Sequence, residues 1–344
     1  MKTIDNKRTE VVVITGSSAG VGRATAKRFA RAGARVALLA RASKALDGAV
    51  AELREMGCTV LGIPVDVADA AQVEAAAERV ERELGPIDIW INAAMATIFA
   101  PVSEITAEEF RRATDVTYLG TVHGTMSALK RMRPRDRGKI VQVGSALAYR
   151  AIPLQSAYCG AKFAIRGFTD ALRVELMHEK SNVGITMVQL SAFNTPQFQW
   201  GRTRLPRRPQ PVPPIFQPEV AARGIHYAAH HQRRELWVGY PAVKAIIGNG
   251  LVPWLADRIL AKKGYSGQMG DQPVPADRPD NLFEPVDRDF GTHGRFDDRS
   301  RKFSVQLWAN THRRGVAAGL LGAALLVTHA MLARRRVRCD DDEY

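Results

Sequence analysis

Three side chains between residues 145 and 162 have types and a spacing that suit proton transfer. Tyr158 and Lys162 are four residues apart, so on a helix they share a face, and Ser145 precedes Tyr158 by thirteen residues. A phenol has an ordinary pKa of about 10, and a neighbouring ammonium lowers that pKa because it favours the phenolate. A serine hydroxyl from another element would hydrogen-bond a substrate oxygen. The alternative is a chance Tyr-x-x-x-Lys pair on a helix, so the surrounding elements must decide.

A glycine-rich loop follows the first apolar run of the chain. Residues 11–14 are β-branched, as in buried parallel strands, and residues 23–32 after the loop have a helical pattern. Glycines let the backbone approach a pyrophosphate, and a helix N-terminus offers free N–H groups to the anion. Glycines also serve ordinary turns, but the order strand, loop, helix predicts a dinucleotide site. The cofactor-binding residues predicted here are Gly16, Ser17, Ser18, Gly20, Val21 and Gly22.

The end of the second predicted strand, residues 35–40, bears on the choice of cofactor. Enzymes that prefer NAD usually carry an acid there, which binds the ribose hydroxyls. This chain has Ala40 followed by Arg41. Without a carboxylate to repel a 2′-phosphate, and with a guanidinium next to it, NADP (as NADPH) is favoured over NAD. The alternative interpretation of Arg41 is a solvated surface residue.

Strand-like and helix-like segments alternate through residue 239. Further strands are predicted at 59–65, 87–91, 139–143, 183–190 and 236–239. Segments of helical periodicity separate them, which predicts right-handed βαβ units. The fold class expected is therefore α/β, a Rossmann-like doubly wound parallel sheet of about seven strands flanked by helices. Ligands bind such sheets at the carboxyl ends of the strands. Residues that fall at predicted strand ends are Gly16, Ala40, Asp66, Asn92, Ser145 and Ser191.

The chain resembles the short-chain dehydrogenase/reductase family with a T-G-x-x-x-G-x-G loop and a Y-x-x-x-K pair, from about residue 11 to residue 239. The resemblance implies an NAD(P)-dependent enzyme that interconverts an alcohol and a ketone or aldehyde. It implies that Tyr158 is the general acid/base, that Lys162 lowers its pKa and holds the nicotinamide ribose, and that Ser145 polarises the substrate oxygen. Asp66 with Val67 would meet the adenine, Asn92 with Ala93 would lie beside the adenosine ribose, and Thr195 would contact the carboxamide.

Three positions depart from the family pattern. Thr117 stands where the family usually has an asparagine that holds a proton-relay water, so its catalytic role is doubtful. Ala94 replaces the glycine of N-A-G, and Ser191–Ala192 replace the P-G after the sixth strand. These changes motivate an alternative: a catalytically weak relative that senses nucleotides or acts as a membrane scaffold. The intact Ser145, Tyr158 and Lys162 argue against that alternative.

The segments after the sixth strand have distinct compositions. Residues 197–218 carry arginines and six prolines, and either form a mobile lid, with Phe198 and Trp200 lining an apolar pocket, or a solvated linker. The Rossmann catalytic domain is expected to span 8–263. Residues 264–312 are expected to form an irregular or disordered linker, although Leu282, Phe283, Phe290 and Phe296 offer apolar anchors. An apolar helix is expected at 313–338.

That terminal helix contains nineteen uncharged residues, 315–333, bracketed by arginines. At ~1.5 Å per residue it would span roughly 28 Å, close to the hydrocarbon core of a bilayer. It predicts possible membrane association through the C-terminus. The alternative is an apolar helix docked on the protein itself or on a partner. The expected location is cytoplasmic, with or without this anchor.

Charge and cysteine content narrow the partners. The net charge of +14 would suit nucleic acid or anionic lipid, but the arginines gather in local patches and no nucleic-acid recognition motif is present. No nucleic-acid partner is therefore expected. Three cysteines without metal-like spacing fit a reducing compartment, and the histidines at 226, 230 and 231 do not suggest a metal site. We expect a homo-oligomer that acts on a small carbonyl or alcohol substrate, with the lid and tail hinting at a lipophilic one.

Overall fold

The structure is a computed structural model that describes residues 9–313 and 315–316. It consists of two compact units, which divide after Ser304. The first unit contains the sheet and every predicted site residue. The described part of the second unit contains one helix, α11 (Val305–Thr311).

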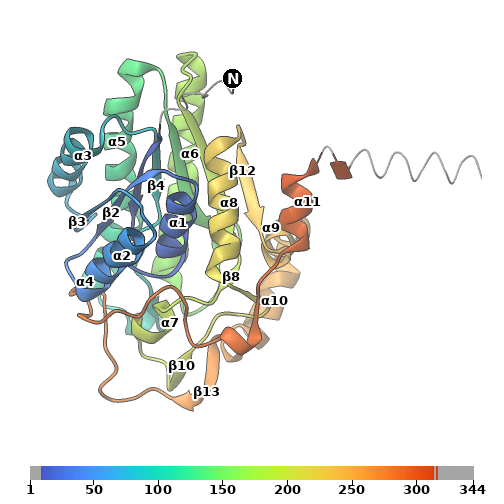
Figure 1. Cartoon of the computed structure of the whole chain (residues 1–344). Helices are drawn as coiled ribbons and strands as arrows, with labels where there is room; N and C mark the ends of the chain where they lie inside the picture. Colours follow the sequence, from blue (N-terminus) through green and yellow to red (C-terminus); the bar gives the residue numbers. More distant parts are fainter. Residues whose placement is uncertain (1–8, 314, 317–344) are drawn as a thin grey trace, which may run out of the picture. The chain divides into compact units, whose positions relative to one another are not determined.

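A parallel sheet of seven strands forms the centre of the first unit, in the order β12-β7-β6-β4-β1-β2-β3 (Figure 1). The chain builds outward from β1 to β3 and then crosses to β4 on the other side of β1. This reversal creates a switch point beside β1, where ligands bind in open α/β sheets. The predicted fold class is confirmed. The strands are β1 (Val11–Thr15), β2 (Arg35–Ala40), β3 (Val60–Pro64), β4 (Ile89–Asn92), β6 (Lys139–Ser145), β7 (Gly184–Leu190) and β12 (Glu235–Val238).

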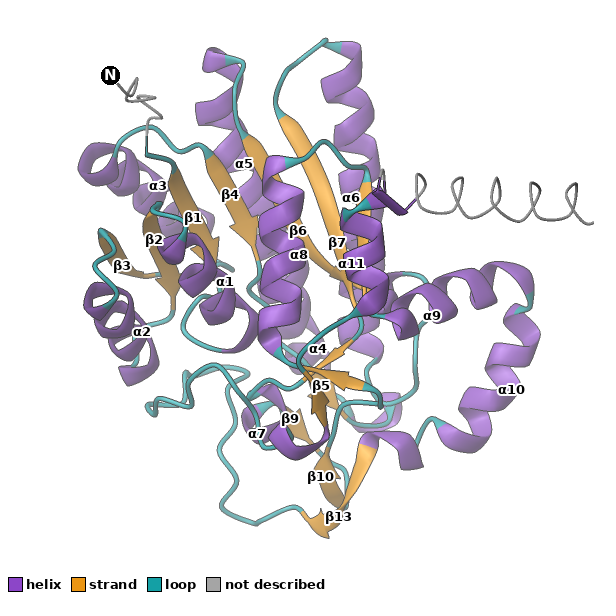
Figure 2. Cartoon of the chain, turned by 45° about the vertical axis from the view of Figure 1, so that its right-hand side comes forward, coloured by secondary structure: helices purple, strands orange, loops and turns teal. Residues whose placement is uncertain are grey.

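Helices cover both faces of the sheet (Figure 2). On one face α1 packs against α2 and α8, and on the other α5 packs against α3 and α6. A π-helical segment (Asp115–Leu119) separates α4 from α5. Beyond β12, α9 and α10 extend past the carboxyl edge of the sheet. The helices are α1 (Gly20–Arg31), α2 (Lys44–Glu55), α3 (Ala70–Leu84), α4 (Ala107–Thr114), α5 (Gly120–Met132), α6 (Ser156–His178), α8 (Pro218–His230), α9 (Tyr240–Leu251) and α10 (Pro253–Lys263).

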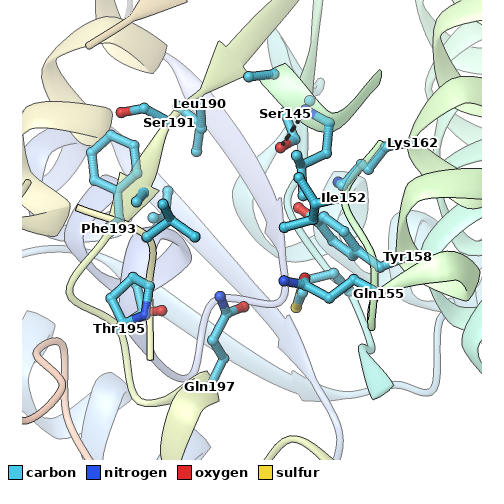
Figure 3. Close-up of a pocket in the computed structure, with 18 of the residues that line it drawn as sticks. Ser145, Ile152, Gln155, Tyr158, Lys162, Leu190, Ser191, Phe193, Thr195 and Gln197 are labelled. Carbon is cyan, nitrogen blue, oxygen red and sulfur yellow. Dashed lines mark hydrogen bonds between the residues drawn. The ribbon is translucent and has the colours of Figure 1, made fainter. Parts of the chain in front are cut away.

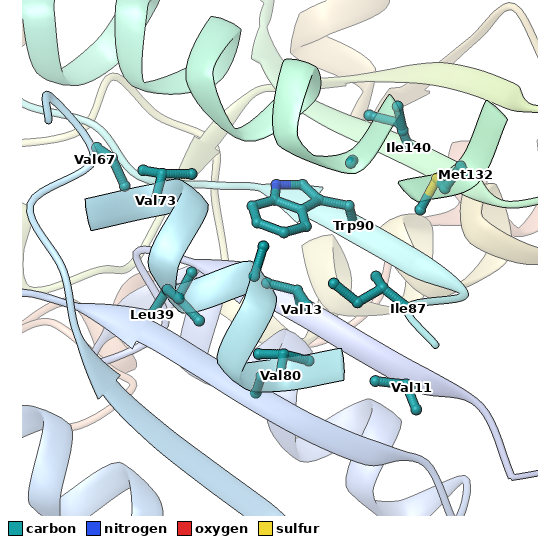
Figure 4. Close-up of a cluster of buried hydrophobic side chains, with 14 of the residues drawn as sticks. Val11, Val13, Leu39, Val67, Val73, Val80, Ile87, Trp90, Met132 and Ile140 are labelled. Carbon is teal, nitrogen blue, oxygen red and sulfur yellow. The ribbon is translucent and has the colours of Figure 1, made fainter. Parts of the chain in front are cut away.

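A hydrophobic core fills the space between the sheet and the layer of α3, α5 and α6 (Figure 4). Trp90 is its largest fully buried side chain, and Val13, Leu39 and Ile140 from β1, β2 and β6 belong to the same cluster. All five residues of β1 are buried, which explains why the strand reads as a continuous apolar run. This core fixes the strand ends that carry the site.

Residues 264–304, most of the segment expected as an irregular or disordered linker at 264–312, belong to the first unit, and residues 274–296 contain no helix or strand. Two apolar side chains of this segment, Leu282 and Phe296, are 1% and 4% exposed. Burial of these anchors offsets the ordering cost of a polar, proline-rich segment. Short strands complete its attachment: β13 (Met269–Pro273) pairs with β10 (Arg207–Pro209), and β14 (Ser300–Arg301) pairs with β11 (Ile215–Phe216).

The predicted membrane segment, residues 315–333, lies outside the described residues except for its first two positions. Within residues 9–313 and 315–316, no helix has the length and apolar character needed to cross a bilayer.

Candidate active site

The three residues of the predicted proton-transfer group come together in the structure (Figure 3). Ser145 is the last residue of β6, while Tyr158 and Lys162 lie one turn apart on α6. The Ser145 hydroxyl accepts the N–H of Leu147 at 3.1 Å. The Lys162 ammonium donates to the carbonyl of Val143 at 2.7 Å and lies 5.4 Å from the centre of the Tyr158 ring. One strand end and one helix face therefore place all three groups together.

Burial dominates the protonation of this group. It raises the pKa of Tyr158 above its ordinary value, and the hydrogen bond with Ser145 opposes this shift without cancelling it. Burial also lowers the pKa of Lys162 to about 8. The sequence predicted a lowered phenol pKa, and that prediction is wrong for this structure because removal from water disfavours both charged forms. Tyr158 is therefore held as a neutral phenol, which is a proton donor.

One cavity of about 1120 Å³ contains these residues and the glycine loop. It runs along the carboxyl edge of the sheet, across the switch point. The residues predicted from the sequence that line it are Gly16, Ser18, Gly20, Val21, Gly22, Arg41, Asp66, Val67, Ala93, Ser145, Tyr158, Lys162 and Thr195. The prediction that several strand ends meet at one site is thus supported by a shared cavity wall.

The glycine loop has no room for side chains at two positions. Gly16 has a φ of +66°, and a Cβ there would lie 2.6 Å from the Cα of Ala94. A Cβ on Gly22 would lie 2.1 Å from the carbonyl oxygen of Gly16. Thr15 fastens the loop to the end of β4, since its hydroxyl accepts the N–H of Ala93 at 3.1 Å. The loop therefore leaves its backbone bare beside the N-terminus of α1, as a pyrophosphate site requires, and the N–H of Gly20 is occupied by the carbonyl of Gly291 at 3.3 Å.

Asn92 and Ser17 are predicted to bind the cofactor, but their side chains lie in the protein interior. The Asn92 amide accepts the indole N–H of Trp90 at 2.8 Å and donates to Thr125 and to Gln142 at 3.0 and 2.9 Å. Ser17 is fully buried, and neither side chain lines the cavity. The buried network around Asn92 ties β4 and β6 to α5, so its amide stabilises the sheet edge rather than facing a ligand.

The hydroxyl of Thr117 likewise forms its hydrogen bonds within the protein. It lies in the π-helical segment and is fully buried. Its hydroxyl accepts the N–H of Ala96 at 2.9 Å and donates to the carbonyl of the same residue at 3.1 Å. Because its donor and an acceptor site are both used, Thr117 positions the loop after β4. We do not assign it a role in proton relay.

The end of the cavity where adenosine is expected, beside Arg41 and Asp66, contains a contact that the sequence did not predict. Arg41 donates to the backbone carbonyls of Asn281 and Phe283, at 2.6 and 2.8 Å. Asp66 accepts the N–H of Ala68 at 3.0 Å and pairs with Arg112 at 2.5 Å. Burial lowers the pKa of Arg41. Residues 281 and 283 are distant from Arg41 in the chain, and a polar stretch without periodicity gave no signal for such a contact.

Residues 197–218, predicted as a lid or a linker and called the lid below, are held beside the cavity by ion pairs. Arg202 and Arg204 each bind the Glu109 carboxylate of α4 at 2.7 Å. Burial opposes ionisation of Glu109, but hydrogen bonds from the two arginines and from the backbone of Thr106 lower its pKa to about 2. Phe198 and Trp200 line the cavity, as predicted for a lid.

The far wall of the cavity is mostly apolar. It comes from the lid and from α9 and α10. Gln155 adds a polar group and is held by Gln268 at 2.7 Å. The apolar lining residues on this side include Ile152, Phe198, Trp200, Val252, Leu255, Ile259 and Leu260.

A parallel sheet with a glycine loop after β1, a serine at the end of β6, and a tyrosine and a lysine one turn apart on α6 is typical of a nicotinamide-dependent oxidoreductase. A family model described as short chain dehydrogenase matches residues 10–204, and the chain belongs to this family. The match stops before the segment that contacts Arg41.

Known proteins extend the likeness beyond the family model. The uncharacterized oxidoreductase YxnA of Bacillus subtilis is 30% identical over 331 residues, which cover 96% of this chain and 91% of YxnA. The 3-dehydrosphinganine reductase of Danio rerio is 32% identical over 54% of this chain and 57% of its own length. The crystal structure of a variant actinorhodin polyketide ketoreductase with NADPH superposes with a TM-score of 0.59, at 26% identity, over 67% of this chain and 95% of that one.

Proposed function

We propose that this oxidoreductase reduces lipophilic ketones or aldehydes with NADPH, and catalyses the reverse oxidation of the alcohols. The observation that carries the proposal is the single cavity that joins the glycine loop, Arg41 and the group of Ser145, Tyr158 and Lys162. The bound nicotinamide would supply the hydride. The remaining requirements, which are binding, orientation and a proton, fall to the residues of this chain.

The proton comes from Tyr158. Hydride addition to a carbonyl carbon leaves negative charge on the oxygen, and a neutral phenol beside that oxygen donates its proton. The raised pKa of Tyr158 keeps this proton in place at neutral pH. Ser145 would hydrogen-bond the same oxygen and stabilise the developing charge. Lys162 adds a positive charge next to the phenol, which stabilises the phenolate that remains.

Cofactor preference is argued from Arg41. Its hydrogen-bond acceptors at residues 281 and 283 are carbonyls, which solvate a guanidinium but do not neutralise it. A 2′-phosphate would provide a full counter-charge and bidentate acceptors. The polyketide ketoreductase with a similar fold was solved with NADPH. These observations support NADPH over NADH.

Substrate class is argued from the apolar wall. Pockets that bind small molecules are mostly apolar, with a few polar groups that fix orientation. Here the apolar lid and the α9–α10 side share one cavity with Ser145 and Tyr158, which suits a carbonyl on an apolar body. A relative named 3-dehydrosphinganine reductase supports reduction as the direction.

A panel of carbonyl compounds tests this proposal. We expect purified protein to oxidise NADPH with ketones or aldehydes, and kcat/KM to rise with the length of the apolar chain. Turnover confined to small polar carbonyls would contradict the substrate class. Tight NADPH binding without turnover of any carbonyl would favour the alternative of a catalytically weak nucleotide sensor. That alternative is tested because the hydroxyl of Thr117 is hydrogen-bonded to Ala96 and we assign it no role in proton relay.

The lowered pKa of Lys162 predicts an alkaline limit to activity. Since this pKa is about 8 instead of the ordinary 10.5, the ammonium is lost as the pH rises through about 8. We expect kcat/KM for reduction to be level below this pH and to fall about tenfold per unit above it. The measurement is a pH profile of the purified enzyme.

Two variants test whether the Lys162 ammonium causes that alkaline limit. Lys162→Arg keeps a positive charge, so its profile should lose the fall near pH 8, whatever its absolute rate. Burial also lowers the pKa of Lys139 to about 8, at the opposite end of β6. Lys139→Met is thus a matched control that should leave the profile unchanged, and a limit that moved with Lys139 would refute the assignment to Lys162.

A further inference from the structure

Residues 280–291, called the strap here, lie along the adenosine half of the cofactor cavity. After β13 the chain returns to the carboxyl edge of the sheet and passes beneath α2 and α1 (Figure 1). Asn281 and Leu282 line the cavity together with Arg41 and Asp66. The strap lies outside residues 10–204, the part of the chain that matches the family model.

The first half of the strap fixes the direction of two arginines. Arg41 donates from its two terminal nitrogens to the carbonyls of Asn281 and Phe283. Arg112, which pairs with Asp66, donates to the carbonyl of Leu282 at 3.1 Å. Three successive carbonyls thus accept from the guanidinium groups that border the expected adenosine 2′ position.

The buried side chain of Leu282, called the plug below, holds those carbonyls in place. Leu282 is 1% exposed and packs in a cluster with Ala96, Ile98 and Ala113. Its N–H donates to the Asp280 carboxylate at 2.8 Å, and Asp280 also binds Arg202 of the lid. The strap therefore has little freedom between residues 280 and 283.

The second half fastens the strap to the glycine loop. Asp289 binds Arg23 of α1 at 2.6 Å, and the Arg23 side chain is only 7% exposed. The carbonyl of Gly291 accepts the N–H of Gly20 at 3.3 Å. Both ends of the strap are thereby tied to elements that would hold the cofactor.

We propose that the strap is part of the cofactor site and sets its specificity by positioning Arg41 for the 2′-phosphate. This inference rests on the proposed use of NADPH. An unrestrained arginine side chain loses rotamer freedom when it binds an anion, and that loss weakens binding. The strap restrains Arg41 beforehand through two of its five N–H donors and leaves three others. NADH has no 2′-phosphate and gains nothing from this arrangement.

Leu282→Ala tests the inference, because it removes the plug and leaves Arg41 in place. We expect the Kd for NADPH, measured by cofactor fluorescence, to rise about tenfold while the Kd for NADH changes less than about twofold. Leu282→Val, which shortens the plug without changing any charge, is a second variant with the same expected direction, in case Leu282→Ala does not fold. Leu176→Ala, in the core at the far end of α6 and 4% exposed, is the matched control. It should lower Tm but leave the ratio of the two Kd values unchanged.

A double-mutant cycle with Arg41→Ala shows whether the strap acts through Arg41. In that background Leu282→Ala should change the ratio of Kd values no further. Equal losses for NADPH and NADH in Leu282→Ala, or an undiminished effect without Arg41, would overturn the inference. A native protein that binds NADPH no more tightly than NADH would instead refute the proposed cofactor preference.

Discussion

Tyr158→Phe is expected to lower kcat for carbonyl reduction about 10³-fold while the Kd for NADPH stays within about twofold of the native value. The substitution removes one hydroxyl and keeps the ring, so the packing of the ring is preserved. The lost group is the only proton donor that we assign to the reacting oxygen. Single-turnover measurements of NADPH oxidation separate this chemical step from cofactor binding.

Tyr227→Phe is the matched control for the loss of a phenol hydroxyl. Tyr227 lies on α8, away from the cavity lining, and its hydroxyl accepts a hydrogen bond from Arg233 at 3.1 Å. This variant should turn over at the native rate. If Tyr158→Phe retained more than about a tenth of the native kcat, Tyr158 would not be the general acid and the proposed chemistry would fail.

Arg41→Ala has the second largest effect that we expect. Loss of charge-assisted hydrogen bonds to a 2′-phosphate, worth about 1.5–3 kcal/mol, should raise the KM for NADPH about 10- to 100-fold. The KM for NADH should change little, because NADH carries a hydroxyl at that position. Parallel kinetics with the two cofactors measure the shift in preference.

Arg54→Ala controls for the loss of a positive charge elsewhere on the same side of the sheet. Arg54 lies in the last turn of α2, is exposed and is not among the residues that line the cavity. Removal of this screened charge should affect NADPH and NADH alike, and only slightly. If Arg41→Ala weakened both cofactors to the same degree, Arg41 would be a structural residue and the preference for NADPH would lose its basis.

The sheet and the catalytic group were predictable because their signals are local. Continuous apolar runs such as Val11–Thr15 report burial on both faces, and the glycine loop reports a tight turn that has no room for a Cβ. Tyr158 and Lys162 share a face by helical spacing alone. These features follow from residues within one element or one turn, so a single sequence suffices to predict them.

Other features depend on distant partners. Asn92 lies at a strand end as predicted, but Trp90 and Gln142 draw its amide into the interior. The upward pKa shift of Tyr158 reflects its burial in the folded protein, which no motif encodes. The contact between Arg41 and residues 281–283 joins parts of the first unit that are far apart in the sequence, and polar residues carry no periodic pattern that would announce it.

The strap also bears on the order in which the protein acquires its parts during synthesis. N-terminal segments leave the ribosome first, and the sheet through β7 can begin to fold while the last third of the chain is still missing. The adenosine half of the cavity stays incomplete until the strap has been made, and the lining as a whole stays incomplete until β14, which ends at Arg301, has been made. A ligand stabilises only the states that bind it. The cofactor should therefore stabilise the completely folded first unit and not its folding intermediates. It would add stability at the end of folding and would not guide the early steps.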